Sequence, residues 1–454
     1  MVNKATTIMS TNNKPDIVFF LIDSLRSDFL QEFIEKHPDE YISKLINEGC
    51  FFSNVISSAP YTLASTMSIF TGFHPNITGI DGWFKTHDSF FNTKIITFIE
   101  ILKNNGYFNS LIYTNYRVAF IPPYAFDMFQ MQKFGNVPDI KDFNTFLKEK
   151  TPKFCVLSFE RIHNEGCDAK GCFSKDEYFK AIQKTSNDIK DFYKKIDLDN
   201  TLTILASDHG FKVLEDKTHP HFQPEKNSGR FVTDKTTKTF CCINYKHLPS
   251  KQINKMIRSI DIMPTVMDII GLPANIAQGK SQLVLIKNSS NNNINNYAFS
   301  LTGWGADSPW NPNCWAIRTD EWKLVKLTIK NKIFSMRKKI IYMLFNIKED
   351  PNEESNVIDN YPDIFKKLLL VLEQQLSLTK RSAIDIYNKN NFKYNKLIKK
   401  RKVLFKIRTK VWFNTLFRYK LYDRLKTQFH NAFIFILKTL LSKRILDFIK
   451  RSTK

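Results

Sequence analysis

The clearest indication of the fold is Thr201-Leu-Thr-Ile-Leu-Ala-Ser-Asp-His-Gly210, in which a run of apolar and β-branched residues leads directly into Asp208 and His209. Such runs of about 4–8 residues are typical of buried β-strands. A second run, Ile17–Ile22, leads in the same way into Asp23. In open α/β sheets, side chains beyond the carboxyl ends of the strands gather in one crevice. The two segments therefore predict an α/β fold that brings two carboxylates and an imidazole together.

A hydroxyl side chain joins this set at the start of a predicted helix. Thr62 follows Ala59-Pro-Tyr and precedes residues 63–71, which we expect to be helical, with Gly72 at their end. A helix N-terminus offers free N–H groups and a positive dipole end, which suit a phosphate or sulfate. A metal bound to the hydroxyl oxygen would lower its pKa and activate it as a nucleophile. The alternative is that Thr62 only caps the helix, which is a common use of threonine.

In their order, these segments resemble the sulfatase branch of the alkaline phosphatase superfamily. The resemblance extends over roughly residues 15–375. It includes three further segments of the body, Gly49–Val55, Thr71–Gly79 and Ser259–Gly271, and two that are similar to the family's C-terminal subdomain, Ala316–Leu324 and Leu344–Asn356. It implies a mixed, mostly parallel sheet flanked by helices, with a smaller α+β subdomain at the C-terminal end.

The 454 residues, 43% of them hydrophobic, are enough for one large catalytic unit with an appendage. We expect a catalytic α/β core over residues 14–287 and a smaller C-terminal subdomain over 297–380. The Asn-rich stretch 288–296 between them is typical of an exposed loop. Residues 386–454 are predicted to form a basic, helical tail.

The resemblance implies that Asp23, Asp208 and His209 bind a divalent metal, with Thr62 Oγ as a fourth ligand. A mixed oxygen and nitrogen set favours Zn or Mn, while Ca or Mg stay open. Ser24 stands where many sulfatases have a second Asp, which argues against the calcium version. The alternative is that the two aspartates are turn residues at strand ends.

The nucleophile position departs from the familiar sulfatases. Those proteins place a Cys or Ser there, within Cys/Ser-x-Pro-Ser-Arg, and convert it to formylglycine, whereas this chain has Thr62-Leu-Ala-Ser-Thr66. Threonine is not a substrate for that conversion, and Thr at this position resembles the phosphoester-cleaving branches of the superfamily. We therefore expect a hydrolase or transferase acting on a phosphoester of a glycan or lipid. Sulfate ester hydrolysis is one alternative, and a non-catalytic membrane- or nucleic-acid-binding protein with a decayed site is another.

Four further residues are candidates for contact with an anionic ester substrate. His163 follows the predicted strand Phe154–Phe159, in a region where family members often have a histidine. His219 and His221 follow His209 by about ten residues, and Lys238 could meet a negative charge. The alternative for each is a solvated surface residue. A different role is expected for Arg26 and Asp28, which we interpret as a structural ion pair beneath the site.

The tail carries most of the chain's formal charge of +23. Residues 386–454 contain 20 Lys and Arg and only two acidic residues, Asp423 and Asp447. Its aromatic and aliphatic residues lie near helical spacing, a pattern that suits the surface of an anionic membrane. The alternatives are that these helices pack on the body or on a second subunit, or that they bind nucleic acid. No recognised nucleic-acid motif accompanies them, so the sequence does not favour that partner.

The sequence predicts a cytoplasmic protein, held peripherally at the inner membrane face by the tail. Its first residues lack the apolar run of a signal peptide, and Ile17–Ile22 is too short to span a membrane. The seven cysteines are an odd number without zinc-finger spacing, which favours free thiols. No feature of the sequence indicates an oligomeric state.

Overall fold

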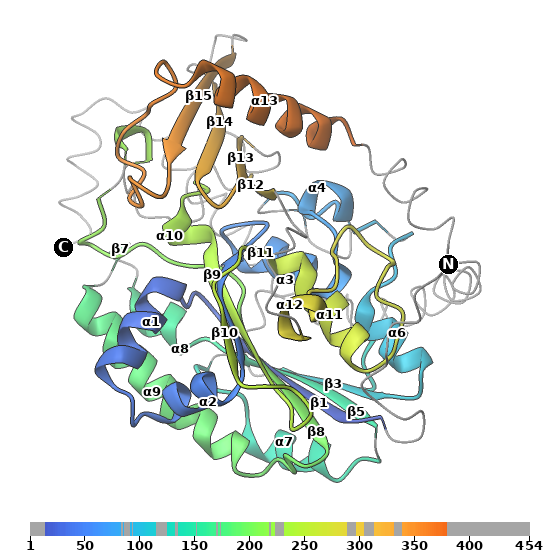
Figure 1. The fold of residues 1–454 in the computed structure, drawn as a ribbon. Coiled ribbons are helices and arrows are strands. Elements are labelled where there is room, and N and C mark those ends of the chain that lie inside the picture. The colour runs from blue at the N-terminus through green and yellow to red at the C-terminus, as the bar shows by residue number, and fades with distance from the viewer. Residues whose placement is uncertain are drawn as a thin grey trace, which may run out of the picture. The chain divides into compact units, whose positions relative to one another are not determined.

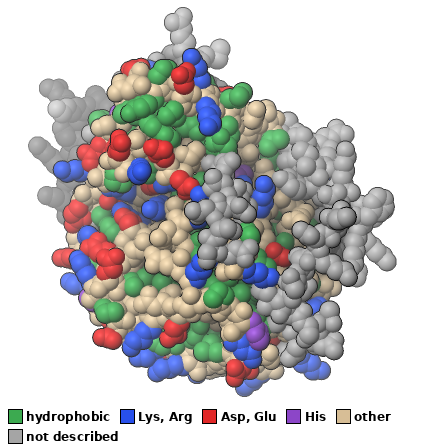
Figure 2. Space-filling view, viewed as in Figure 1, with side chains coloured by type: hydrophobic (Ala, Val, Ile, Leu, Met, Phe, Trp, Pro, Cys, Tyr) green, Lys and Arg blue, Asp and Glu red, His purple; other side chains and the backbone are tan. Residues whose placement is uncertain are grey.

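The computed structural model describes residues 14–378, apart from 83–84, 86–90, 93, 115–124, 132–134, 151, 169–170, 173, 218, 223–230, 288–296, 304–312 and 331–337. The Asn-rich loop 288–296 and the basic tail 386–454 predicted above lie outside the described residues. Within the described ranges, no helix combines the length and apolar character needed to cross a membrane. Figure 2 shows acidic and basic side chains mixed over the described surface on the face drawn.

The body is built on a nine-stranded sheet with the order β10-β2-β9-β8-β1-β5-β3-β4, and β11 also pairs with β2 (Figure 1). Neighbouring strands are parallel except that β9 runs antiparallel to both β2 and β8. The predicted mixed, mostly parallel sheet is thus confirmed. The strands are β1 Asp16–Ile22, β2 Cys50–Ile56, β3 Phe108–Tyr113, β4 Met128–Met131, β5 Lys153–Phe159, β8 Thr201–Ser207, β9 Lys238–Asn244, β10 Lys251–Ile253 and β11 Ile257–Arg258.

Helices cover both faces of this sheet, which explains why most positions of its central strands are buried. In β1, Val18, Phe20 and Ile22 pack into the core under one helical layer, while Phe19 meets Phe70 on the opposite face, with ring centroids 5.2 Å apart. The first layer contains α1 Ser27–Lys36, α2 Tyr41–Glu48, α7 Ile140–Leu147, α8 Arg161–Gly166 and α9 Lys175–Tyr193. The second contains α3 Thr62–Thr71, α4 Pro75–Thr78, α6 Phe98–Asn104, α11 Ile262–Ile269 and α12 Leu283–Lys287.

A second, antiparallel sheet follows in the order β12-β13-β14-β15. Its strands are Ala298–Thr302, Cys314–Arg318, Trp322–Lys330 and Lys338–Asn346, and α13 (Pro362–Ser377) packs on one face through Leu368 and Leu372. The smaller α+β part predicted for the C-terminal end is therefore present, and we call β12–β15 with α13 the C-terminal subdomain. The remaining short elements are β6 Cys167–Asp168, β7 Gly171–Cys172, η3 Pro220–Phe222, α10 Asp234–Thr237 and η5 Ser259–Asp261.

Candidate active site

Two carboxylates lie at the carboxyl edge of the sheet because β1 and β8 are adjacent and parallel. Ile22 pairs with Ser207, so Asp23 and Asp208 leave their strands at the same level. Both are buried, Asp208 completely. Ser24 has a φ of 67° and turns the chain sharply after Asp23. Its N–H donates to Asp208 Oδ1 at 3.1 Å and its hydroxyl donates to Asp23 Oδ1 at 2.7 Å, so the turn fixes both carboxylates.

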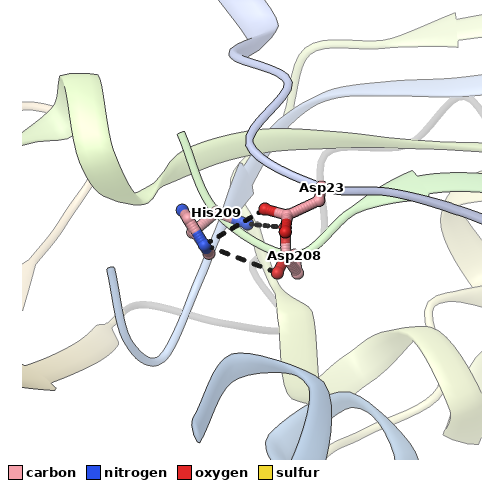
Figure 3. Close-up of side chains that lie close together, drawn as sticks. All are labelled: Asp23, Asp208 and His209. Atoms are coloured by element: carbon pink, nitrogen blue, oxygen red, sulfur yellow. Dashed lines mark hydrogen bonds and ion pairs between the residues drawn. The ribbon is translucent and has the colours of Figure 1, made fainter. Parts of the chain in front are cut away.

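His209 completes a compact group, which we call the site cluster: Asp23, Asp208 and His209 (Figure 3). One ligand atom from each residue lies within 4.8 Å of the others. His209 Nε2 is 3.5 Å from Asp23 Oδ1 and 3.5 Å from Asp208 Oδ2. His209 Nδ1 is 2.8 Å from the carbonyl oxygen of Gly210, which can only accept a hydrogen bond. Nδ1 therefore carries a proton, and Nε2 faces the two carboxylates.

The site cluster has an excess of negative charge in a buried position. Asp208 Oδ1 accepts from the N–H groups of Ser24 and His209, but Asp208 Oδ2 accepts no hydrogen bond from the residues that the structure describes. Burial raises the pKa of Asp208 to about 6; His209 opposes this rise and the Asp23 carboxylate adds to it. A buried polar atom without a partner is costly. Two carboxylates and an imidazole nitrogen are ligand types that fit a divalent cation of the zinc or manganese type.

Thr62 turns its hydroxyl to the same place. It is the first residue of α3, and Thr62 Oγ1 lies 3.2 Å from His209 Nε2 and 3.4 Å from Asp23 Oδ2. The N-cap position of this helix is occupied by Tyr61. The interpretation of Thr62 as a simple N-cap is therefore wrong, because its side chain points into the site cluster instead.

The other four predicted residues are not part of the site cluster. His163, on α8, meets the ring of Phe211 edge-on, with centroids 6.2 Å apart, just after the His209 turn. Lys238 opens β9 and is half-buried. The rings of His219 and His221 stack 5.2 Å apart, and the N–H of His219 donates to the carbonyl of Glu353 at 2.9 Å, so this pair lies beside the C-terminal subdomain. Contact with substrate stays a prediction for all four.

Arg26 forms the structural ion pair that the sequence predicted, together with a partner that it did not. Its Nε donates to Asp28 Oδ1 at 2.9 Å and its Nη1 to Asp216 Oδ2 at 2.6 Å. The guanidinium is buried and lies 3.8 Å above the ring of Phe29. It thereby joins the loop after β1 to the loop after His209. Asp216 gave no signal in the sequence, where an aspartate in a polar loop is typical of the surface.

A second buried group of charges was also missed, and we call it the junction cluster: Asp234, Arg318, Lys323 and Glu353. Asp234, on α10, lies 2.8 Å from Arg318 Nη2 and 3.0 Å from Lys323 Nζ, and Lys323 Nζ lies 2.8 Å from Glu353 Oε1. Burial alone would raise the pKa of Asp234, but Arg318 and Lys323 together lower it far below its usual value. In the sequence, Arg318, Lys323 and Glu353 stood out only as parts of segments similar to the family's C-terminal subdomain, with no indication that they contact Asp234.

Fold and site together define a member of the alkaline phosphatase-like superfamily. The profile of the Sulfatase family matches residues 15–272. A second profile, described as N-sulphoglucosamine sulphohydrolase, C-terminal, matches residues 226–381. The chain belongs to the sulfatase family.

Individual proteins agree with this assignment. Arylsulfatase K of Bos taurus is 26% identical over 207 residues, which are 43% of this chain and 34% of that protein. The chain thus spans about a third of the length of the curated relatives it matches.

Two solved structures share the fold. One, from work on glycosaminoglycan metabolism by Bacteroides thetaiotaomicron, has a TM-score of 0.61 at 15% identity and covers 78% of this chain and 94% of its own. The other, a complex with its substrate D-glucosamine-2-N,6-O-disulfate, has a TM-score of 0.59 at 14% identity and covers 84% of this chain and 99% of its own.

Proposed function

We propose that this chain is a metal-dependent hydrolase of sulfate esters, in which the hydroxyl of Thr62 takes part in the reaction. The observation that carries the proposal is the convergence of Thr62 Oγ1 with the site cluster at the carboxyl edge of the sheet. The sequence alone ranked phosphoester chemistry first, on the identity of one residue. Membership of the sulfatase family, with a match over residues 15–272, supports sulfate ester chemistry more strongly.

Asp23, Asp208 and His209 would hold the metal through Asp23 Oδ1, Asp208 Oδ2 and His209 Nε2, the atoms that face one another across the cluster. When bound, a divalent metal supplies Lewis-acid polarisation of the ester and lowers the pKa of a nearby hydroxyl. The chain prepares these ligands itself. Ser24 fixes both carboxylates, and the hydrogen bond from Nδ1 to the Gly210 carbonyl holds the imidazole in the tautomer that can bind.

Thr62 has two properties that the transfer of a sulfuryl group requires. Its Oγ1 lies at the site cluster, from which it could attack the sulfur atom while the S–O bond to the alcohol breaks and the alcohol leaves, or position a water that attacks in the same way. It also opens the ten-residue helix α3, whose free N–H groups and positive dipole end are directed at the same point. A negatively charged sulfate would be stabilised there, most strongly where charge develops in the transition state.

A sulfated saccharide is the substrate class that we propose. Support comes from the C-terminal profile named after N-sulphoglucosamine sulphohydrolase and from the fold neighbour solved with D-glucosamine-2-N,6-O-disulfate. His163, His219, His221 and Lys238 remain the candidate contacts for its anionic and polar groups. The membrane contact through residues 386–454 and a place at the inner membrane face are further proposals, supported only by the composition of that segment.

Phosphoester cleavage is the second candidate, and the hydroxyl of Thr62 favours it. Threonine cannot become formylglycine, and an unmodified hydroxyl beside a metal site resembles the phosphoester-cleaving branches of the superfamily. The two candidates share the metal ligands, the helix N-terminus and the nucleophile. They differ in the central atom of the ester, so a direct comparison of substrates separates them.

The test compares an aryl sulfate, an aryl phosphomonoester and a bis-aryl phosphodiester as substrates, after loading the protein with Zn or Mn. We expect aryl sulfate turnover in the parent and a loss of about a thousandfold or more in Thr62→Ala. Thr71→Ala is the matched control, because it removes the same hydroxyl at the other end of α3, where Thr71 Oγ1 donates to the Met67 carbonyl. Its turnover should stay within about threefold of the parent.

Two results would contradict the proposal. Aryl sulfate turnover that is unchanged in Thr62→Ala would remove Thr62 from the mechanism. Turnover of the phosphodiester or the phosphomonoester without turnover of the sulfate, again lost in Thr62→Ala, would establish the second candidate instead.

A further inference from the structure

The short helix α10 (Asp234–Thr237) is bonded to both loops that carry the site. The carbonyl of Thr236 accepts from the N–H of Gly210 at 2.9 Å, immediately after His209. The carbonyl of Thr237 accepts from the N–H of Ser57 at 2.7 Å, in the segment that leads to Thr62. The contact is tight, because a Cβ atom on Gly210 would lie only 2.3 Å from the carbonyl oxygen of Lys235. The position of α10 therefore decides where both loops lie.

Ser57 extends this connection directly to a proposed metal ligand. Its hydroxyl lies 2.6 Å from the carbonyl oxygen of Asp208 and 2.9 Å from that of Ala59. By donating to the Asp208 carbonyl, it can fix the backbone of Asp208. On its other side, the hydroxyl of Ser300 in β12 donates to the Ser57 carbonyl at 2.6 Å. The N–H of Leu301 donates to the carbonyl of Ser58 at 3.0 Å. Strand β12 of the C-terminal subdomain thus contacts the loop that supports Asp208.

The junction cluster fixes α10 to the same subdomain. Asp234 binds Arg318 at the end of β13 and Lys323 in β14, and the N–H of Asp234 donates to Glu353 Oε2 at 2.6 Å. These groups are buried, so water does not compete for their hydrogen bonds. Two connections, one through Ser300 and one through α10, therefore run from the C-terminal subdomain to the loops of the site, and they meet at Ser57.

We propose that Ser57, Ser300 and α10 are positioning elements through which the C-terminal subdomain sets the metal affinity of the site cluster. The inference rests on the proposed function in that it takes Asp23, Asp208 and His209 as metal ligands. Groups that orient metal ligands typically change metal affinity about 10- to 100-fold when they are removed. Ser57 acts on the backbone of Asp208, and Ser300 acts through Ser57. The subdomain would therefore contribute to metal binding at the site.

The test is a calorimetric titration of the metal-free, full-length protein with Zn and with Mn, for the parent, Ser57→Ala, Ser300→Ala and the double variant. We expect the metal Kd of Ser57→Ala to rise at least tenfold and that of Ser300→Ala to rise by a smaller factor. The double variant should match Ser57→Ala within about twofold, because effects that act in series do not add. Ser186→Ala is the control: Ser186 is a buried serine of α9 whose hydroxyl accepts from the N–H of Ile42, and its Kd should equal that of the parent.

The thermal unfolding of each metal-free variant separates positioning from simple support. If Ser57→Ala and Ser300→Ala are destabilised like Ser186→Ala but keep the metal Kd of the parent, the inference is overturned. If the parent itself binds neither metal, the metal assignment in the proposed function fails, and this inference fails with it. If the parent binds metal and the Kd changes appear without any turnover of an aryl sulfate, the inference stands and the proposed reaction fails.

Discussion

The site cluster and the junction cluster are both buried groups of charges, yet burial has opposite outcomes in them. In the site cluster, Asp208 has a second carboxylate and the imidazole ring of His209 as neighbours, and its pKa is raised to about 6. In the junction cluster, Asp234 is buried to a similar extent, but Arg318 and Lys323 hold its pKa far below the usual value. The junction cluster contains two cationic side chains, those of Arg318 and Lys323, whereas the site cluster could bind a metal cation.

The opposite pKa shifts of Asp208 and Asp234 show that burial of a carboxylate does not by itself indicate function. A charge that finds opposite charges and hydrogen bonds inside the protein is structural, and breaking such a group is costly. A charge that is left uncompensated raises the free energy of the folded state unless an ion or substrate supplies the missing charge. Three experiments test whether the two clusters differ in this way.

The largest effect is expected from Asp234→Asn, which keeps the shape of the side chain but leaves Arg318 and Lys323 without their shared carboxylate. We expect a loss of about 3–5 kcal/mol in the free energy of unfolding of the metal-free protein, measured in urea at pH 7. Asp363→Asn is the control, because Asp363 is exposed and lies 3.7 Å from Lys366. It should change the free energy of unfolding by less than about 0.5 kcal/mol. Similar small losses in both variants would mean that the junction cluster does not stabilise the fold.

The second effect is a dependence of stability on pH that comes from Asp208. The pKa of Asp208 is about 6 in the folded protein, compared with 3.8 for an aspartate that makes no interactions. The folded state therefore holds the proton more tightly than the unfolded chain. This stabilisation is fully present below about pH 4 and is lost as the pH rises through about 6. It amounts to about 3 kcal/mol.

Asp208→Asn should abolish this contribution, because an amide resembles the protonated acid at every pH. The measurement is the free energy of unfolding of metal-free parent and variant between pH 4 and pH 7, in the presence of a chelator. The parent should lose stability relative to the variant as the pH rises. A difference between the two proteins that is constant over this range would show that Asp208 titrates alike in the folded and unfolded states.

The smallest of the three effects is stabilisation by added metal. At a concentration of about 100 times the Kd, a metal that binds only the folded state raises the free energy of unfolding by about 2.7 kcal/mol. For Asp208→Asn, a hundredfold weaker Kd would reduce this gain to about 0.4 kcal/mol at the same concentration. Thermal unfolding with Zn, Mn, Ca or Mg measures the gain and ranks the metals. An equal gain in parent and variant would place the metal outside the site cluster.

Much of the fold and the centre of the site could be predicted because they depend on local patterns. The apolar runs 17–22 and 201–206 correspond to β1 and β8, and the residues that follow them are Asp23, Asp208 and His209. Parallel neighbouring strands then bring these residues together without further information. Thr62 begins a helix as expected, and the Arg26–Asp28 pair is present.

The junction cluster could not be predicted, because its partners come from distant segments and carry charge. Arg318 lies 84 residues after Asp234, and Glu353 lies 119 residues after it. Charged residues are usually exposed, so the sequence did not indicate that Lys323 and Glu353 are buried. Only tertiary packing places them inside. The roles of His163, His219, His221 and Lys238 stay predictions for a related reason, since contact with substrate depends on where a substrate lies.

The spacing within the junction cluster has a consequence for biosynthesis. The ribosome makes Asp234 well before Arg318, Lys323 and Glu353, because translation proceeds from the N-terminus. Until those residues emerge, burial of Asp234 would leave a carboxylate without its cations, which is unfavourable. We therefore expect α10, and with it the final loops around the site, to become stable only after residue 353 has left the ribosome, because the partners of Asp234 come from residues 318–353.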